Sequence, residues 1–93
     1  MKYTEHWYWW EDPQYEQYAP KLPTFIAAGT PMTKRWYYKQ VIHRLGGPAI
    51  EVLDNSNGDE YYLFGTNLDE QIYWNELSKG PMYVLLKYYR KKM

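Results

Sequence analysis

The stretch that decides the fold is HRLGGPAIEVLDNSNGDEYYLFG, residues 43–65. Gly-Gly-Pro at 46–48 predicts a turn, because glycine supplies positive φ and proline fixes its own φ. Residues 49–53 alternate between apolar and polar side chains, and residues 60–64 are aromatic and apolar, so both segments are predicted strands. Asn57-Gly58 suits the left-handed positions of a tight connection between them. The stretch therefore predicts an antiparallel hairpin over 48–64.

Upstream, KRWYYKQVIHR at 34–44 predicts one strand or a pair of short strands. HWYWW, which ends at Trp10, is strand-like in composition and is stopped by Glu-Asp-Pro at 11–13. Prolines and a glycine punctuate residues 13–33 too often for a long element, so this region is predicted to be an ordered loop with a short turn at 24–28.

Downstream, a helix is predicted over 67–78. Asn67 can cap it, with Glu70 three residues later as in a capping box. A broad apolar face follows at helical spacing, and Lys79-Gly80-Pro81 is a C-terminal stop signal. That face comprises Leu68, Ile72, Tyr73, Trp74 and Leu77.

The C-terminal segment MYVLLKYYRKK fits either a helix or a strand, and its β-branched and aromatic content favours a strand. Together the predicted elements define a single α+β domain over residues 1–93. It would hold an antiparallel sheet of four to five strands with one helix packed on a face.

Aromatic residues make up 20% of the chain, with 12 Tyr, 5 Trp and 2 Phe. Each ring can bury about 150–250 Å², so the core of a 93-residue domain cannot hold them all. The remaining rings are expected at the surface, where Tyr and Trp are typical of protein interfaces. Four consecutive rings, Trp7, Tyr8, Trp9 and Trp10, are the predicted anchors for a protein partner.

The formal net charge is zero, but the charges are segregated along the chain. Residues 21–44 carry +5 with no acid, and residues 45–80 carry −6. These blocks either pair with one another in the fold or leave a basic patch on an otherwise neutral molecule. Overall neutrality argues against a nucleic-acid mimic and against a general DNA binder.

Several function classes lose support from residues that the chain lacks. There is no cysteine, which excludes disulfides and cysteine-based zinc sites. The N-terminus does not resemble a signal peptide, and no apolar run is long enough to span a bilayer, so we expect a cytoplasmic protein without membrane contact. His6 and His43 lack ligand spacing, and Ser56 and Ser78 lack a nucleophile pattern. We therefore expect no catalytic residue, no metal and no cofactor.

Trp36 to Glu51 follows the pattern W-Y-Y-x-x-x-x-H-R-x-x-G-P-A-x-E. It resembles a repeat, W-Y-x-N-G-x-x-H-R-x-D-G-P-A, of small uncharacterised proteins of tailed bacteriophages. The resemblance covers about residues 34–77, and residues 36–38 align with residues 61–63 at an offset of 25. It implies a phage origin, a bacterial host cytoplasm and a meandering antiparallel sheet, but no reaction.

The chain departs from this repeat at two places. Lys39-Gln40 stands where the repeat has Asn-Gly, so a wider turn is expected there. Gly46 replaces an acidic residue, which would remove a contact to Arg44.

His43 and Arg44 have two interpretations. They could bind an anion, or they could bridge strands and tie the Gly-Gly-Pro turn to an acid such as Glu51, and membership of the repeat favours the structural role. Tyr88, Tyr89 and Arg90, in the basic segment 87–92, would suit single-stranded nucleic acid but also suit a solvated tail.

The leading hypothesis is a non-enzymatic phage-type protein that docks its aromatic-rich surface on a host protein. It would inhibit a bacterial defence or regulatory factor, as anti-CRISPR proteins do. The alternative is a binder of single-stranded nucleic acid or nucleotides that uses the basic and aromatic segments. A homo-oligomer closed through an unpaired edge strand or through the aromatic surface is a third hypothesis.

Overall fold

The computed structural model describes residues 8–26, 32–53 and 58–90. Its strands form three small antiparallel sheets and its helices are short, so the predicted α+β class is confirmed. The sequence predicted one sheet of four to five strands, whereas the structure divides its short strands among three separate sheets. The largest sheet has the order β1-β2-β5, formed by Thr24–Ile26, Thr33–Arg35 and Ile50–Val52. Two-stranded sheets are formed by β3 (Tyr37–Tyr38) with β4 (Val41–Ile42) and by β6 (Tyr61–Leu63) with β7 (Thr66–Leu68).

The predicted arms at 49–53 and 60–64 are antiparallel neighbours. The Ala49 N–H donates to the Glu60 carbonyl at 2.8 Å, and the Glu60 N–H donates to the Ile50 carbonyl at 2.9 Å. Beyond this bridge β6 pairs with β7 instead, in a segment whose first residues were predicted to be helical. The predicted turn at Asn57-Gly58 falls partly on residues 54–57, which lie outside the described residues.

The hairpins β3–β4 and β6–β7 are two copies of one structure, at the offset of 25 residues that the sequence indicated. Tyr38 pairs with Val41 in the first hairpin, and Leu63 pairs with Thr66 in the second. Each hairpin therefore has a two-residue turn, and each turn residue has positive φ, which is the geometry of a type I′ turn. The internal repeat is thus structural as well as sequential.

The expectation of a wider turn at Lys39-Gln40 is wrong. Lys39 and Gln40 have φ of 49° and 70°, so they adopt the left-handed conformation that Asn-Gly would adopt without strain. The pairing of β3 with β4 on either side imposes the tight turn despite the unfavourable residues. In the second copy glycine occupies the later turn position, Gly65, with φ of 89°.

We expect the double variant Lys39→Asn/Gln40→Gly to be more stable by about 1 kcal/mol, because Asn-Gly relieves left-handed strain at both positions. Urea unfolding followed by tryptophan fluorescence measures this gain. Lys39→Ala/Gln40→Ala is the matched control, since alanine removes the same side chains but keeps the strain. Equal stability of the two double variants would contradict the type I′ assignment.

Helix α1 spans Glu70–Leu77, within the predicted range. Its N-cap is Asp69, whose carboxylate accepts the Gln71 N–H at 3.1 Å, whereas Asn67 lies in β7, so the predicted capping box is wrong. The stop signal is confirmed, because the helix ends at Leu77 and Gly80 follows with φ of 100°. The buried face of α1 consists of Tyr73, Glu76 and Leu77.

The predicted C-terminal strand is wrong, because α2 (Pro81–Val84) continues into a π-helical turn, η3 (Leu85–Tyr89). Pro81 starts the helix, since proline at the first helical position needs no amide partner. Val84 and Tyr88 are buried four residues apart, while Leu86 between them is 48% exposed. This is helical spacing, and the aromatic composition had suggested strand alternation instead.

The N-terminal region also differs from its prediction. Trp9–Glu11 and Pro13–Tyr18 form two 3₁₀ helices, η1 and η2, where a strand and a loop were expected. Asp12 separates them and accepts the Gln14 N–H at 3.0 Å, so the Asp-Pro sequence starts η2 as an N-cap followed by proline. Strand β1 occupies part of the predicted turn at 24–28; residues 27 and 28 lie outside the described residues.

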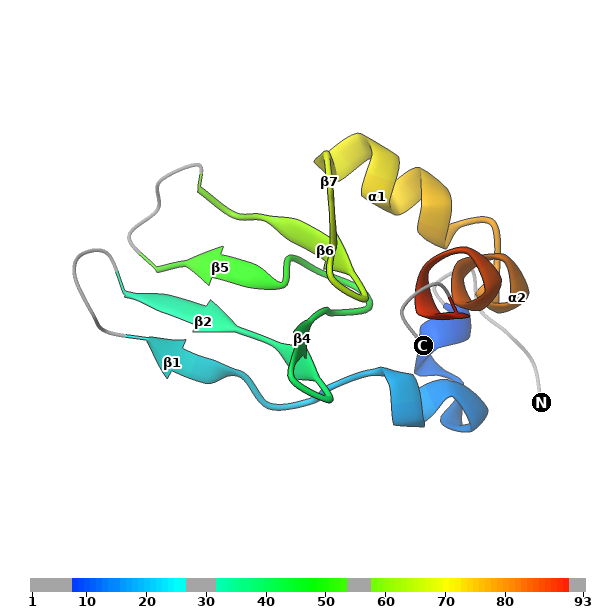
Figure 1. Cartoon of the computed structure of the whole chain (residues 1–93), viewed down its shortest axis with the longest axis horizontal. Coiled ribbons are helices and arrows are strands. Elements are labelled where there is room, and N and C mark those ends of the chain that lie inside the picture. Colours follow the sequence, from blue (N-terminus) through cyan, green and yellow to red (C-terminus); the bar gives the residue numbers. More distant parts are fainter. Residues whose placement is uncertain (1–7, 27–31, 54–57, 91–93) are drawn as a thin grey trace.

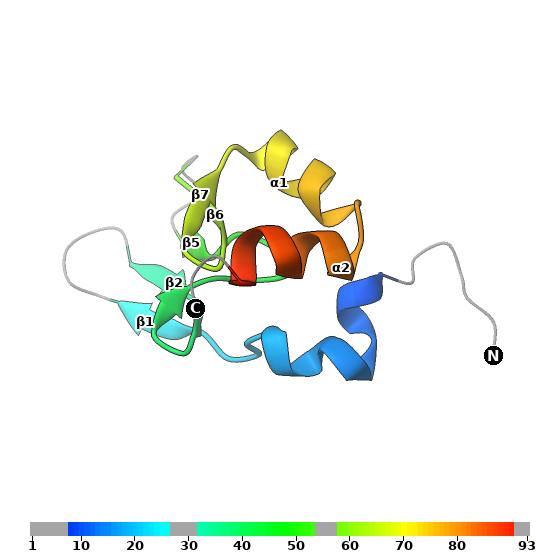
Figure 2. The ribbon, with the colours of Figure 1, turned by 45° about the vertical axis from the view of Figure 1, so that its right-hand side comes forward.

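The core lies where the turns of the two hairpins meet the helices. It consists of Leu45, Leu63, Phe64, Tyr73, Leu77, Val84 and Tyr88. The C-terminal helix lies between α1 and the N-terminal 3₁₀ helices, and the sheet β1-β2-β5 extends away from all of them (Figure 1). A second view shows the same arrangement (Figure 2). No residue of β1, β2 or β5 is buried, so the helical end carries the packed core and the side chains around it.

Candidate functional site

Three rings from distant parts of the chain form an open groove on the helical end. Tyr8 stacks on Trp10 with ring centroids 4.7 Å apart, and Trp10 lies 6.3 Å from Trp74 of α1. Tyr8 is 44% exposed and Trp74 is 37% exposed. Together with Glu11 and Gly46 they line a hollow of about 430 Å³, which we call the aromatic groove.

Gly46 forms the floor of the aromatic groove, and the structure explains why it has no side chain. A Cβ at this position would lie 2.6 Å from Nε1 of Trp10, and the φ of 93° would strain any other residue. Any side chain here, including the acid of the repeat that residues 36–51 resemble, would clash with Trp10. The absence of a side chain at position 46 is therefore what lets Trp10 pack against this loop.

Hydrogen bonds to the Tyr73 side chain fix the backbone of the loop 44–47. The Tyr73 hydroxyl donates to the Arg44 carbonyl at 2.6 Å and accepts the amides of Gly46 and Gly47 at 3.0 and 3.2 Å. Burial raises the pKa of Tyr73 to about 12, so the hydroxyl keeps its proton. One buried ring on α1 thus sets the position of the groove floor.

The four predicted anchors have different roles. Trp7 lies outside the described residues. Trp9 donates from Nε1 to the Leu77 carbonyl at 2.7 Å and packs edge-on against Trp10, so it fixes the N-terminal segment to the end of α1. Tyr8 and Trp10 face the groove. Trp74 was not predicted as an anchor, because the sequence places it among the apolar residues of a helix face.

An acidic hollow of about 720 Å³ lies beside the aromatic groove. It is lined by Asp59, Glu60, Tyr61, Asn67, Leu68, Asp69 and Glu70. Tyr61 joins the two regions, since its ring centroid is 6.2 Å from that of Trp74. Burial and the neighbouring Glu70 carboxylate raise the pKa of Tyr61. The sequence signal was the pair of acidic dipeptides at 59–60 and 69–70, which had been counted only as part of an acidic block.

His43 is fully buried, which removes it from any contact with a surface anion in this structure. Its Nδ1 accepts the Phe64 N–H at 2.8 Å, so Nε2 carries the proton and donates to the Tyr18 carbonyl at 2.9 Å. The ring also stacks on Phe64 with centroids 3.8 Å apart. His43 therefore has a structural role, but it ties η2 to the turn of the second hairpin rather than tying the Gly-Gly-Pro turn to an acid as expected.

Arg44 stacks on the buried ring of Trp36, with Cζ 3.7 Å from the ring centroid. Its Nη1 donates to the Pro48 carbonyl at 3.1 Å, which ties the Gly-Gly-Pro turn as expected. The expected acid, Glu51, forms its ion pair with Lys34 instead, at 3.7 Å. A Cβ on Gly47 would lie 2.9 Å from the Arg44 guanidinium, so this glycine makes room for the stacked cation.

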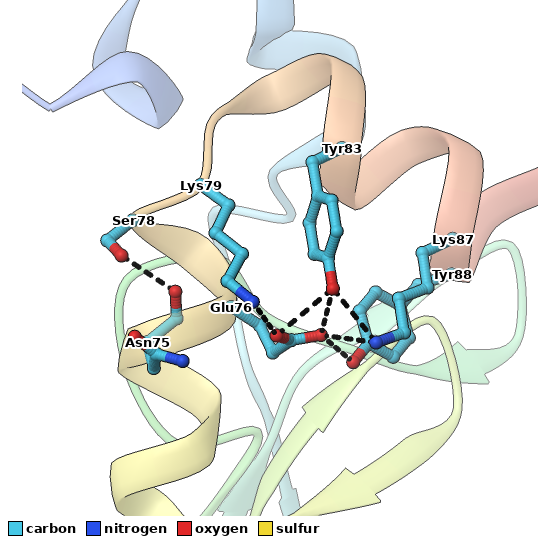
Figure 3. A network of polar contacts seen from close by, with 7 residues as sticks. All are labelled: Asn75, Glu76, Ser78, Lys79, Tyr83, Lys87 and Tyr88. Atoms are coloured by element: carbon cyan, nitrogen blue, oxygen red, sulfur yellow. Dashed lines mark hydrogen bonds and ion pairs between the residues drawn. The ribbon is translucent and has the colours of Figure 1, made fainter.

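The C-terminal residues surround Glu76, which is 5% exposed (Figure 3). The Tyr88 hydroxyl donates to Oε1 of Glu76 at 2.5 Å and Lys87 donates to the same oxygen at 2.9 Å, while Tyr83 contacts both oxygens. Tyr88 is 6% exposed, and Tyr89 packs against Tyr18, Tyr38 and Phe64. Neither tyrosine presents a free ring to a nucleic-acid base, and Arg90 ends the described chain beside them.

Burial raises the pKa of Glu76, but hydrogen bonds from Tyr88, Lys87, Lys79 and Tyr83 outweigh it and lower the pKa to about 2. The carboxylate is therefore ionised, and neighbouring side chains of the same chain already donate hydrogen bonds to both of its oxygens. None of the hollows that we describe is lined by Glu76. Within the described ranges, no group of three or more histidine, aspartate or glutamate side chains is arranged to hold a metal ion.

The chain is thus a small α+β protein. On its surface the aromatic groove adjoins the acidic hollow. Comparison with protein-family models, with curated proteins and with solved structures gave no match. Among the residues that the structure describes, no helix has the length and apolar character needed to cross a membrane.

Proposed function

We propose that this protein is a non-enzymatic binding protein that docks its aromatic groove on a protein partner. The observation that carries the proposal is the convergence of Tyr8, Trp10 and Trp74 around Gly46, with rings left partly exposed beside a packed core. Exposed tryptophan and tyrosine rings are the commonest energetic anchors of protein interfaces. A partner that covers them would bury apolar area that the fold leaves in water.

Preorganisation of the groove supports the same proposal. The Trp9 indole donates a hydrogen bond to the end of α1, and the Tyr73 hydroxyl makes hydrogen bonds to the loop that carries Gly46. The rings therefore need little ordering when a partner arrives, which lowers the entropic cost of association.

The biological setting is a finer part of the proposal. The partner would be a protein of a bacterial host, and docking would inhibit a defence or regulatory factor in the host cytoplasm, in the manner of an anti-CRISPR protein. The support is the resemblance of Trp36–Glu51 to the repeat of tailed-phage proteins, together with the duplicated hairpin at the matching offset.

The nucleic-acid alternative has less support from the geometry. Stacking on bases needs exposed ring faces beside cations. Tyr88 is buried against Glu76, Tyr89 packs on other rings, and Lys87 pairs with Glu76. We therefore keep protein binding as the proposed function.

Affinity capture from bacterial lysate, with captured proteins quantified by mass spectrometry, tests the proposal. We expect the Tyr8→Ala/Trp74→Ala variant to recover its partner about tenfold less than the wild type, because it removes two central anchors. Leu22→Ala/Phe25→Ala is the matched control, since these residues are 84% and 59% exposed and lie just before and within β1, outside the groove lining. Equal recovery by the groove variant and the wild type would refute the proposal. Light scattering of the purified chain shows whether the partner is a second copy of this chain or a different protein.

A further inference from the structure

We infer that the aromatic groove receives a segment of its protein partner that carries arginine or lysine beside an apolar residue, with the cation directed to the acidic hollow. This inference rests on the proposed docking function and names the chemistry of the partner. Two observations support it. The aromatic groove and the acidic hollow adjoin each other, and the carboxylates around the hollow form no ion pair among the described residues.

The two regions form one surface. Rings lead from the groove to the hollow through Trp10, Trp74 and Tyr61, with successive centroids 6.3 and 6.2 Å apart. Glu70 and Trp74 are four residues apart on α1, so they project from the same side of the helix. A bound segment that fills the groove therefore has carboxylates within reach of its next side chains.

The carboxylates of this surface have no cationic partner among the described residues. Within residues 8–26, 32–53 and 58–90 the ion pairs lie elsewhere, at Lys21–Glu16, Lys34–Glu51, Lys79–Glu76 and Lys87–Glu76. Four acids remain around the hollow, and Glu11 borders the groove. The charge segregation was expected either to pair within the fold or to leave a basic patch, whereas at these residues the structure has an acidic patch.

Arg44 is the described cation whose charge acts on Tyr61, and its single positive charge is outnumbered by the four acids of the hollow. Its guanidinium is stacked on Trp36 and donates to the Pro48 carbonyl. The surface thus keeps a negative potential, which attracts cationic partners and repels acidic ones.

Arginine is suited to such a surface on two counts. Its planar guanidinium stacks on aromatic faces and makes paired hydrogen bonds to carboxylates. Lysine supplies the same charge but cannot make the paired hydrogen bonds. The aromatic groove offers the ring faces and the hollow offers the carboxylates. An uncharged apolar segment would use only the groove, and a glutamate-rich segment would be repelled.

Two synthetic nine-residue peptides test the inference; they share their leucines and differ in carrying either three arginines or three glutamates. Each is titrated into the ¹⁵N-labelled full chain while the indole N–H signals of Trp10 and Trp74 and the amides of 59–61 and 67–70 are followed by NMR. We expect the arginine peptide to shift these signals and the glutamate peptide to leave them unchanged. The absence of shifts at millimolar arginine peptide, or equal shifts with both peptides, would overturn the inference.

Glu60→Gln/Glu70→Gln is the informative variant, because it removes two charges with little change of shape and leaves the Asp69 cap in place. We expect it to bind the arginine peptide roughly fivefold more weakly, whereas Glu16→Gln/Glu51→Gln, with the same change in net charge, should bind like the wild type.

The same variants separate the inference from the proposed function. If Tyr8→Ala/Trp74→Ala loses the captured partner while Glu60→Gln/Glu70→Gln keeps it fully, docking at the groove stands and the cationic segment is refuted. If both variants keep the partner, the proposed function fails as well.

Discussion

Replacing Glu76 by alanine is expected to lower the free energy of unfolding by about 2–3 kcal/mol, because it removes the hydrogen bonds of a nearly buried carboxylate and leaves a buried hydroxyl unpaired. The carboxylate is nearly sealed from water and accepts hydrogen bonds from Tyr83, Lys87 and Tyr88 (Figure 3). Its removal would leave the Tyr88 hydroxyl buried without an acceptor. The π-helical turn that places Lys87 and Tyr88 side by side would lose its anchor on α1.

Equilibrium unfolding in urea measures this effect, provided that the slope of the transition stays constant. Lys79→Ala is the matched control, because it removes a 3.2 Å ion pair to the same carboxylate from an exposed lysine, and exposed ion pairs contribute little to stability. If Glu76→Ala and Lys79→Ala are equally destabilising, the buried hydrogen bonds of Glu76 do not contribute as the geometry indicates.

Acid is expected to destabilise the protein through His43 at a pH where carboxylates remain largely ionised. Burial lowers the pKa of His43 from 6.5 to about 4, even though the bond to the Tyr18 carbonyl favours the charged form. Because the folded pKa lies below the unfolded one, the full contribution of neutral His43 is present above about pH 6.5 and is lost as the pH falls towards 4. The expected loss is about 2 kcal/mol between pH 7 and pH 5, and about 3 kcal/mol by pH 4.

Urea unfolding of the wild type and of His43→Gln at pH 7, 6 and 5 tests this expectation. Glutamine can donate and accept hydrogen bonds but does not titrate, so the variant should be less stable at pH 7 and should lose less stability on acidification. Parallel pH profiles for the two proteins would show that His43 is not the group that titrates. Glu76 contributes little between pH 7 and 5, because its pKa is lowered from 4.5 to about 2 and its stabilisation is lost only as the pH falls from about 4.5 towards 2.

Both expected effects concern the side chains that hold the surface in place. Glu76 and Tyr73 lie on α1 together with Trp74, and His43 connects η2 to the second hairpin. Destabilising either network would therefore loosen the groove as well as the fold. For this reason the binding variants proposed above change only exposed or rim side chains.

Sequence patterns predicted the parts of the fold that depend on neighbouring residues. The Gly-Gly-Pro turn, the short strands of 34–44, the end of α1 before Gly80 and the offset of 25 residues all have local causes. The patterns failed where composition was ambiguous. Aromatic residues suggested strands at both termini, but 3₁₀ and π-helical turns form there because Pro13 and Pro81 start helices and the rings pack into a shared core.

The candidate site was predicted only in part. Tyr8 and Trp10 were singled out for their density of rings, and both line the groove. Trp74 and the acidic hollow were missed, since their roles depend on residues 8–10, 46, 59–61 and 67–70 meeting in space. No spacing along the chain encodes such a meeting.

The amino-acid sequence by itself determined the α+β class, the repeated hairpin and the excess of rings over what a small core can bury, because these follow from local conformational preference and from composition. Only the tertiary structure decided which rings stay exposed and which charges stay unpaired. That choice depends on close approaches, such as Trp10 over the bare backbone of Gly46 and Tyr88 against Glu76, which exist only once distant segments are packed together.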